Sequence, residues 1–242
     1  MHTKKTKILA CAVVIEELRS KLSEDIDCET LDFGLHRSPE QLRIKLQEYI
    51  DESTEYENIV LAYGICGMAV IGLCSNTSRL IVPRVDDCIA IFLGSRKAYL
   101  KEQHNHPGSL FLSKGWIDGR IDDTSPTVKI FEHLAKKYGI ERAKRMMQVY
   151  EEKQPLRHYK RLAFISTSNE TNLDEFKTIA RERAGNLGLH YDEISGSTAL
   201  IEKIACGSWD ENFIVKMPGQ SITVEDFWID ADKESSPSSF WS

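Results

Sequence analysis

The chain has 242 residues, with 31 Lys and Arg against 37 Asp and Glu, and therefore a formal net charge of −6. Its apolar and charged fractions, 41% and 28%, are ordinary for a globular protein with a sizeable core. The acidic balance and the lack of a basic stripe argue against nucleic acid as a main partner. No run of apolar residues approaches the roughly 18 that a membrane helix needs.

The first half of the chain alternates between aliphatic runs and amphipathic segments. Leu42, Leu46 and Ile50 recur at helical spacing after Ser38 and Pro39, which suit the start of a helix. The expected elements are strands at 7–14, 31–35, 58–62 and 79–82 and helices at 16–22, 38–50, 68–73 and 88–93.

The second half continues the same rhythm after a loop and a long helical stretch. We expect a loop at 103–109, an extended segment at 110–116, a helical stretch at 124–152 with a break near Gly139, strands at 161–166, 189–194 and 212–217, and helices at 172–187 and 197–205.

This alternation predicts an α/β fold of two Rossmann-like lobes, with mainly parallel sheets and a cleft between them. The expected division is an N-terminal α/β lobe at 1–122, a helical connector at 123–158, a C-terminal α/β lobe at 159–230 and a polar tail at 231–242.

Cysteines mark the points where apolar runs give way to turns. Cys11, Cys66 and Cys88 each occupy such a point. Ligands of open α/β sheets bind at the carboxyl ends of the strands, so these thiols are candidate ligands of a three-sulfur metal site with a vacant position. Thiolates suit an iron–sulfur cluster or zinc. The alternative is that these thiols are buried and only pack in the core. We interpret the other three cysteines, Cys28, Cys74 and Cys206, as packing or surface thiols.

The six cysteines and the short N-terminal apolar run, which lacks the pattern of a secretory signal, favour a reducing, cytoplasmic location.

Charged side chains near Cys88 are the catalytic candidates. Asp87 either transfers a proton or orients a metal ligand, and the alternative is a helix N-cap. Arg84 either binds an anionic substrate or forms a structural salt bridge. His36 follows a short apolar segment and is a candidate at the same edge.

Small residues in the turns are candidates for cofactor binding. Gly64 and Gly67 bracket Cys66 and allow its backbone N–H groups to cradle a phosphate or a cluster. Gly94 and Ser95 are candidates for the lining of the same cleft, and the alternative for Gly94 is the end of a helix.

Together these residues carry a resemblance that spans nearly the whole chain. The segments that match are Ala10-Cys11, Leu35-His36 with Pro39, Tyr63-Gly64-Ile65-Cys66-Gly67, Pro83-Arg84, Asp87-Cys88-Ile89 and Leu93-Gly94-Ser95, with Gly115-Trp116, Gly207-Ser208-Trp209 and Pro218-Gly219 downstream. They resemble the family called domain of unknown function 1638. At Asp86 the chain departs from the family pattern, which has histidine there.

The resemblance implies a cytoplasmic protein of one-carbon metabolism in bacterial and archaeal anaerobes, linked to corrinoid-dependent methyltransferases. The leading expectation is therefore a metal-dependent enzyme, with an iron–sulfur cluster on the three cysteines and a small anionic substrate. The alternatives are a non-enzymatic accessory protein that binds a corrinoid protein or a methyltransferase, and zinc-dependent methyl transfer.

Overall fold

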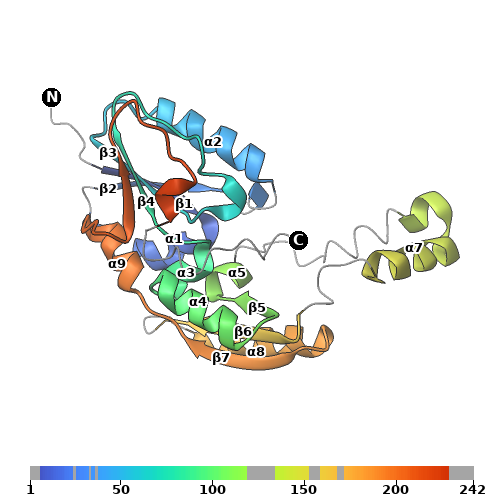
Figure 1. Ribbon diagram of the computed structural model, residues 1–242. Helices are drawn as coiled ribbons and strands as arrows, with labels where there is room; N and C mark the ends of the chain where they lie inside the picture. Colours follow the sequence, from blue (N-terminus) through green and yellow to red (C-terminus); the bar gives the residue numbers. More distant parts are fainter. Residues whose placement is uncertain are drawn as a thin grey trace. The chain divides into compact units, whose positions relative to one another are not determined.

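The computed structural model describes residues 6–23, 26–32, 34–35, 38–118, 134–152, 159–167 and 172–228 (Figure 1). Its contacts divide the chain into two compact units. The first comprises residues 1–101, 167–169 and 195–242, and the second comprises residues 102–166 and 170–194. The second unit is thus inserted into the chain of the first.

The first unit is built on a five-stranded sheet in the order β2-β1-β3-β4-β8. Neighbouring strands are parallel except β8, which runs antiparallel to β4 at one edge. The strands are β1 (Thr6–Cys11), β2 (Ile26–Leu31), β3 (Asn58–Ala62), β4 (Arg79–Pro83) and β8 (Phe213–Lys216). Every residue of β3 is buried, as expected for a central strand covered on both faces.

Helices cover this sheet and short turns complete it. In the view of Figure 1, α2 lies above the strands, and α1 and α9 lie below them. The helical elements of this unit are α1 (Ala12–Arg19), α2 (Pro39–Asp51), α3 (Cys88–Phe92) and α9 (Ala199–Cys206), with the 3-10 turns η2 (Cys66–Met68) and η4 (Glu225–Phe227). The buried residues of α2 are Leu42, Leu46 and Ile50, which confirms the predicted apolar face.

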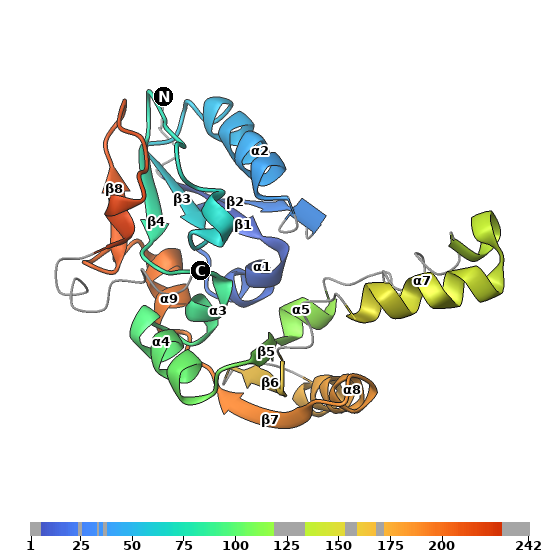
Figure 2. The same cartoon turned by 45° about the vertical axis from the view of Figure 1, so that its right-hand side comes forward.

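The second unit contains a three-stranded sheet in the order β5-β6-β7, in which β5 and β6 are parallel. Helix α8 packs on this sheet (Figure 2). Leu112, Phe164 and Ala180 belong to its buried core. The elements are β5 (Ser109–Leu112), β6 (Arg161–Ser166), β7 (His190–Ser195), α5 (Lys114–Asp118), α7 (Ile140–Glu152) and α8 (Leu173–Asn186), and α4 (Arg96–Asn105) crosses from the first unit into the second.

The predicted α/β fold with mainly parallel sheets is confirmed, and most element positions agree with it. Five expectations are wrong. Residues 12–14 belong to α1 rather than to the first strand, and the second strand lies at 26–31 rather than at 31–35. Residues 103–105 belong to α4 rather than to a loop, and residues 114–116 belong to α5 rather than to an extended segment. Residues 69–73 form turns and irregular chain rather than a helix. The expected break near Gly139 is present, with a φ of 83°. The first part of the expected helical stretch, 119–133, lies outside the described residues.

The division into units differs from the predicted one. The chain crosses between them within α4, before the expected boundary at 122. Strand β8, expected in the second lobe, instead pairs with β4 in the first sheet, with Ile81 opposite Val215. An edge strand that pairs antiparallel has no local signature that assigns it to one sheet or the other.

Candidate functional site

The order of the first sheet has a switch point between β1 and β3. From β1 the chain passes to β2 on one side, and it then returns to β3 on the other. In sheets of this kind, ligands bind outside the carboxyl ends of the strands where the strand order reverses. Cys11 is the last residue of β1, and Cys66 follows β3 by four residues. The two thiols therefore come from the two sides of the switch point.

The register of the strands places Tyr63 beside Cys11. Ala10 pairs with Ala62 across the parallel ladder, so the next residues, Cys11 and Tyr63, leave the two strands at the same level. Cys11 is 8% exposed and Tyr63 is 2% exposed. The carboxyl edge at β1 and β3 thus holds a thiol and a phenol as neighbours in a buried environment.

The loops that carry Cys66 and Cys88 are bonded to each other through the backbone. The Ile65 N–H donates to the Val85 carbonyl (3.0 Å), and the Cys66 N–H donates to the Asp86 carbonyl (3.2 Å). Gly64 permits this approach, because an added Cβ would lie 2.7 Å from the Cα of Asp87. The predicted role of Gly64 in cofactor binding is untested, and its observed role is to let the two loops touch.

Cys66 lies in a strained turn. Cys66, Gly67 and Met68 have successive φ values of 43°, 64° and 74°, in the left-handed region that residues other than glycine rarely occupy. A Cβ on Gly67 would also meet the ring of Pro39 at 2.9 Å. Such strain persists only where the surroundings enforce it, and it is concentrated at functional sites.

Cys11 acts on the ionisation of Cys66, and Cys11 and Cys66 both act on that of Cys88. Burial, then Asp87, then Cys11 raise the pKa of Cys66 to about 12. Burial, then Cys66, Asp87 and Cys11 raise the pKa of Cys88 well above its ordinary value. Burial also raises the pKa of Cys11. The role of these three cysteines as ligands of one metal stays a prediction.

Backbone N–H groups face all three sulfurs. Val13 supplies one to Cys11, Gly64 and Cys88 supply two to Cys66, and the N–H of Cys88 also faces its own sulfur. Each of these contacts lowers the pKa of the thiol and offsets part of the effect of burial. Hydrogen bonds of this kind stabilise a negatively charged sulfur, which is the form that binds a metal.

The described residues do not, however, form a ready metal site. Within the ranges that the structure describes, no group of three His, Cys, Asp or Glu side chains has a metal-binding arrangement. A rearrangement of at least one cysteine side chain is therefore needed before all three sulfurs contact one ion. His36, the predicted histidine, lies outside the described residues.

Tyr63 is the functional candidate that the sequence analysis missed. Its hydroxyl is buried and has no hydrogen-bond partner among the described residues. Burial raises the pKa of Tyr63 well above its ordinary value, and Cys11, Cys66, Cys88 and Cys28 raise it further. Its position directly after a central strand at the switch point was the available signal.

Asp87 has the expected capping role and a second contact. One carboxylate oxygen accepts from the Ile89 N–H (2.9 Å), which caps α3, and the other accepts from the Tyr99 hydroxyl (3.0 Å). Burial raises the pKa of Asp87, and these hydrogen bonds partly offset the rise. The neighbouring Asp86 forms an ion pair with Arg96 (3.0 Å). A proton-transfer role for Asp87 remains a prediction.

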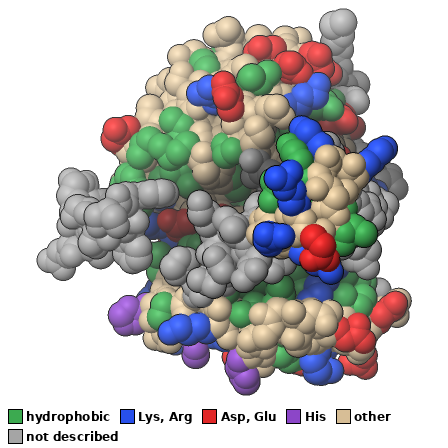
Figure 3. All heavy atoms as spheres, turned by 90° about the vertical axis from the view of Figure 1, so that its right-hand side faces the viewer, with side chains coloured by type: hydrophobic (Ala, Val, Ile, Leu, Met, Phe, Trp, Pro, Cys, Tyr) green, Lys and Arg blue, Asp and Glu red, His purple; other side chains and the backbone are tan. Residues whose placement is uncertain are grey.

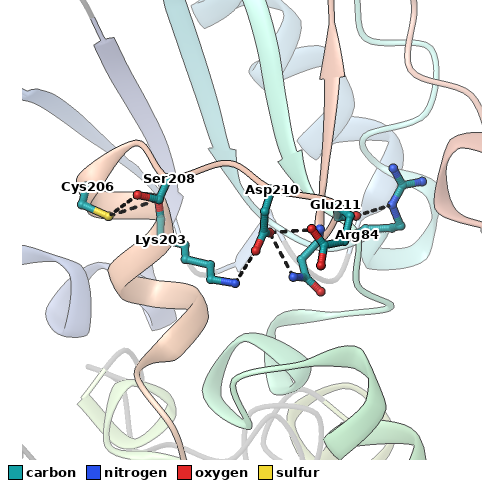
Figure 4. Close-up of polar contacts among 7 residues, drawn as sticks. Arg84, Lys203, Cys206, Ser208, Asp210 and Glu211 are labelled. Atoms are coloured by element: carbon teal, nitrogen blue, oxygen red, sulfur yellow. Dashed lines mark hydrogen bonds and ion pairs between the residues drawn. The ribbon is translucent and has the colours of Figure 1, made fainter.

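Arg84 is bonded to the main chain. Its guanidinium donates to the carbonyl of Glu211 (3.2 Å; Figure 4). It also donates to the carbonyls of Phe213 (3.3 Å) and Asp226. These bonds tie the end of β4 to β8 and to η4. They give Arg84 a structural role, and its predicted binding of an anionic substrate is untested.

We expect Arg84→Met to lower the free energy of unfolding by about 2 kcal/mol, because three carbonyls lose a charged donor. Urea denaturation measures the change. Arg19→Met is the control, since the Arg19 side chain is 65% exposed and its ion pair with Glu16 is long at 3.6 Å. That variant is expected to stay within about 0.5 kcal/mol of the wild type. Equal effects of the two substitutions would contradict the structural role.

Gly94 and Ser95 serve local structure. Gly94 follows α3 with a φ of 80°, which confirms the expected helix end, and a Cβ there would meet Ser197 at 2.5 Å. Ser95 accepts a hydrogen bond from the Ala98 N–H at the start of α4 (3.1 Å). Their predicted role in cofactor binding is untested.

The remaining cysteines differ from the three at the switch point. Cys206 is exposed, at the end of α9, and its sulfur lies 3.3 Å from the Ser208 hydroxyl (Figure 4). Cys28 is half-buried on β2, and burial raises its pKa to about 11.

In reduced, metal-free protein at pH 8, iodoacetamide is expected to alkylate Cys206 at least about 10-fold faster than Cys28, because only about one Cys28 thiol in a thousand is then ionised. Mass spectrometry of peptides from a time course measures both rates. Equal rates would show that Cys28 is neither buried nor shifted as described.

Comparison with known proteins agrees with the residue pattern. The model of the family described as "Protein of unknown function (DUF1638)" matches residues 30–205, which is most of the chain and includes Cys66, Asp87 and Cys88. No curated protein and no solved structure matches significantly. In the described part of the chain, no helix is both long and apolar enough to cross a bilayer. From the family match, the chain belongs to the DUF1638 family.

Proposed function

We propose that this protein is a metal-dependent enzyme whose centre is held by Cys11, Cys66 and Cys88. The observation that carries the proposal is the gathering of three thiols at the switch point of a parallel sheet. Each comes from a different strand end, so the fold, and not a local motif, brings them together. The proposal extends to a small substrate bound at the same edge.

The surroundings of the sulfurs support an ion rather than simple packing. The thiols of buried Cys11 and half-buried Cys66 and Cys88 all have raised pKa values, so they are costly to ionise without a cation. A soft metal removes that cost, and the N–H groups that face each sulfur favour the ionised ligands. The strained backbone of Cys66 is a further mark of a functional position.

Three cysteines leave one position of the metal open. When bound, an iron–sulfur cluster or a zinc ion with such a position acts as a Lewis acid toward a substrate oxygen or a thiol. Asp87, which accepts hydrogen bonds from the α3 backbone and from Tyr99, is the residue that we propose to hold a proton for the reaction. An anaerobic one-carbon or corrinoid-linked reaction, with a small anionic substrate, is the reaction class that we assign to it.

Anaerobic purification, followed by measurement of iron, acid-labile sulfide and zinc, tests the proposal. Iron with sulfide supports a cluster, and zinc without a brown chromophore supports zinc-dependent methyl transfer. Wild-type protein that contains neither, and does not bind either on reconstitution, contradicts the proposal.

A second candidate function is that of a non-enzymatic accessory protein. The exposed basic surface on and just before α7 supports it. Lys and Arg side chains are visible on the face shown in Figure 3. On α7 and in the segment just before it, the exposed basic residues are Lys136, Lys137, Arg142, Lys144 and Arg145. Ile140 is 60% exposed among them. This surface suits an acidic partner, such as a corrinoid protein or a methyltransferase.

An anaerobic pull-down from the native cell separates the two candidates. A stable methyltransferase or corrinoid-protein partner, together with metal-free protein, favours the accessory role. A metal-loaded protein without such a partner favours the enzyme.

A further inference from the structure

The hydroxyl of Tyr63 is an unsatisfied polar group in the first unit. Tyr63 is 2% exposed, and its hydroxyl oxygen has no hydrogen-bond partner among the described residues. Buried hydroxyls are nearly always paired, since an unpaired one loses its bonds to water without compensation. Such an atom therefore marks a position at which a partner is missing.

The location of this hydroxyl indicates what the partner is. Register places Tyr63 level with Cys11, and the two residues after it lead directly into Cys66. The groups that raise the pKa of its phenol include the thiols of Cys11 and Cys66, and thiols are weak donors and weak acceptors that make poor partners for a phenol. The hydroxyl thus lies where a molecule bound at the switch point would present its own polar atoms.

We infer that Tyr63 is a substrate-binding residue whose hydroxyl donates a hydrogen bond to an oxygen of a small carboxylate bound beside the three cysteines. The inference rests on the proposed function for the location of the ligand and adds its chemical class. A carboxylate oxygen is a strong acceptor for a phenol.

Tyr56 provides a matched control. It is also buried, at 6% exposure, but its hydroxyl is satisfied and donates to a carboxylate oxygen of Asp27 (2.6 Å). Removal of a paired hydroxyl and of an unpaired one should have opposite consequences for stability.

The first measurement is the melting temperature of metal-free Tyr63→Phe and Tyr56→Phe. Tyr63→Phe is expected to melt at or above the wild-type temperature, because it deletes an unsatisfied group. Tyr56→Phe is expected to melt below it, because Asp27 loses its donor. A fall for Tyr63→Phe equal to that for Tyr56→Phe would show that the Tyr63 hydroxyl has a structural partner, and would overturn the inference.

The second measurement uses the full chain, purified anaerobically with whatever metal it carries, titrated with formate and with acetate. Calorimetry and the ultraviolet difference spectrum of tyrosine report binding. Tyr63→Phe is expected to weaken carboxylate binding about 10-fold or more, and Tyr56→Phe to leave it unchanged. Equal binding by wild type and Tyr63→Phe, or no binding by either, overturns the inference.

These outcomes separate the inference from the proposed function. Wild-type protein that carries no metal but binds carboxylate in a Tyr63-dependent way would support the role of Tyr63 and contradict the metal centre. Equal metal content in wild type and Tyr63→Phe, with no difference in the binding of formate or acetate, would support the metal centre and contradict the role of Tyr63.

Discussion

Cys66→Ser is expected to abolish metal binding. A serine hydroxyl stays protonated at neutral pH and is a harder donor than a thiolate, so the ion loses one of its three protein ligands. Wild-type protein should carry about one zinc, or about four irons with sulfide, per chain. The variant should retain less than about a tenth of that amount, since loss of even an indirect contact to a ligand costs 10-fold to 100-fold in affinity. Elemental analysis and the visible absorption spectrum measure both.

Cys206→Ser is the matched control, because the same chemical change is made at an exposed thiol at the end of α9. It should leave the metal content unchanged. Cys88→Ser should reproduce the loss, which guards against an effect confined to the strained turn at Cys66. Normal metal content in both Cys66→Ser and Cys88→Ser, with circular dichroism showing that both are folded, would contradict the proposed centre.

The positions of Cys11, Cys66 and Cys88 at or after the ends of three neighbouring strands were predictable because they depend only on a parallel sheet. If three consecutive strand ends share one sheet, the residues that follow them meet at one edge, whatever the details of packing. Sequence supplied both the strands and the thiols. It also supplied the N-cap at Asp87 and the helix end at Gly94, which depend on local backbone chemistry.

What the sequence could not supply depends on contacts between distant segments. Residues 69–73 are mostly apolar, which is typical of a buried helix, yet they form turns and irregular chain. Their backbone bonds to a distant segment instead, because the Gly72 N–H donates to the Ile222 carbonyl and the Ile222 N–H donates to the Leu73 carbonyl. The main-chain bonds of Arg84 likewise come from residues more than 120 positions away. The missing partner of Tyr63 is of the same kind, because an absent contact has no local pattern.

Gly64→Ala is expected to destabilise the protein by about 3 kcal/mol. The new Cβ would lie 2.7 Å from both the N and the Cα of Asp87 and 2.9 Å from the Val85 carbonyl oxygen, so the clash is with backbone and not with a flexible side chain. Relief requires the two loops to separate, which breaks the bonds from Ile65 and Cys66. Urea denaturation measures the loss.

Gly72→Ala separates this clash from ordinary glycine strain. Gly72 has a φ of 88° but open space around its Cα, so only the left-handed conformation is penalised, by about 1 kcal/mol. The two variants should also differ in function. Separation of the loops moves Cys66 away from Cys88, so Gly64→Ala should bind metal weakly even under conditions in which it is folded, whereas Gly72→Ala should bind as wild type does. Equal metal content in the two folded variants would show that the contact at Gly64 supports the fold without positioning the thiols.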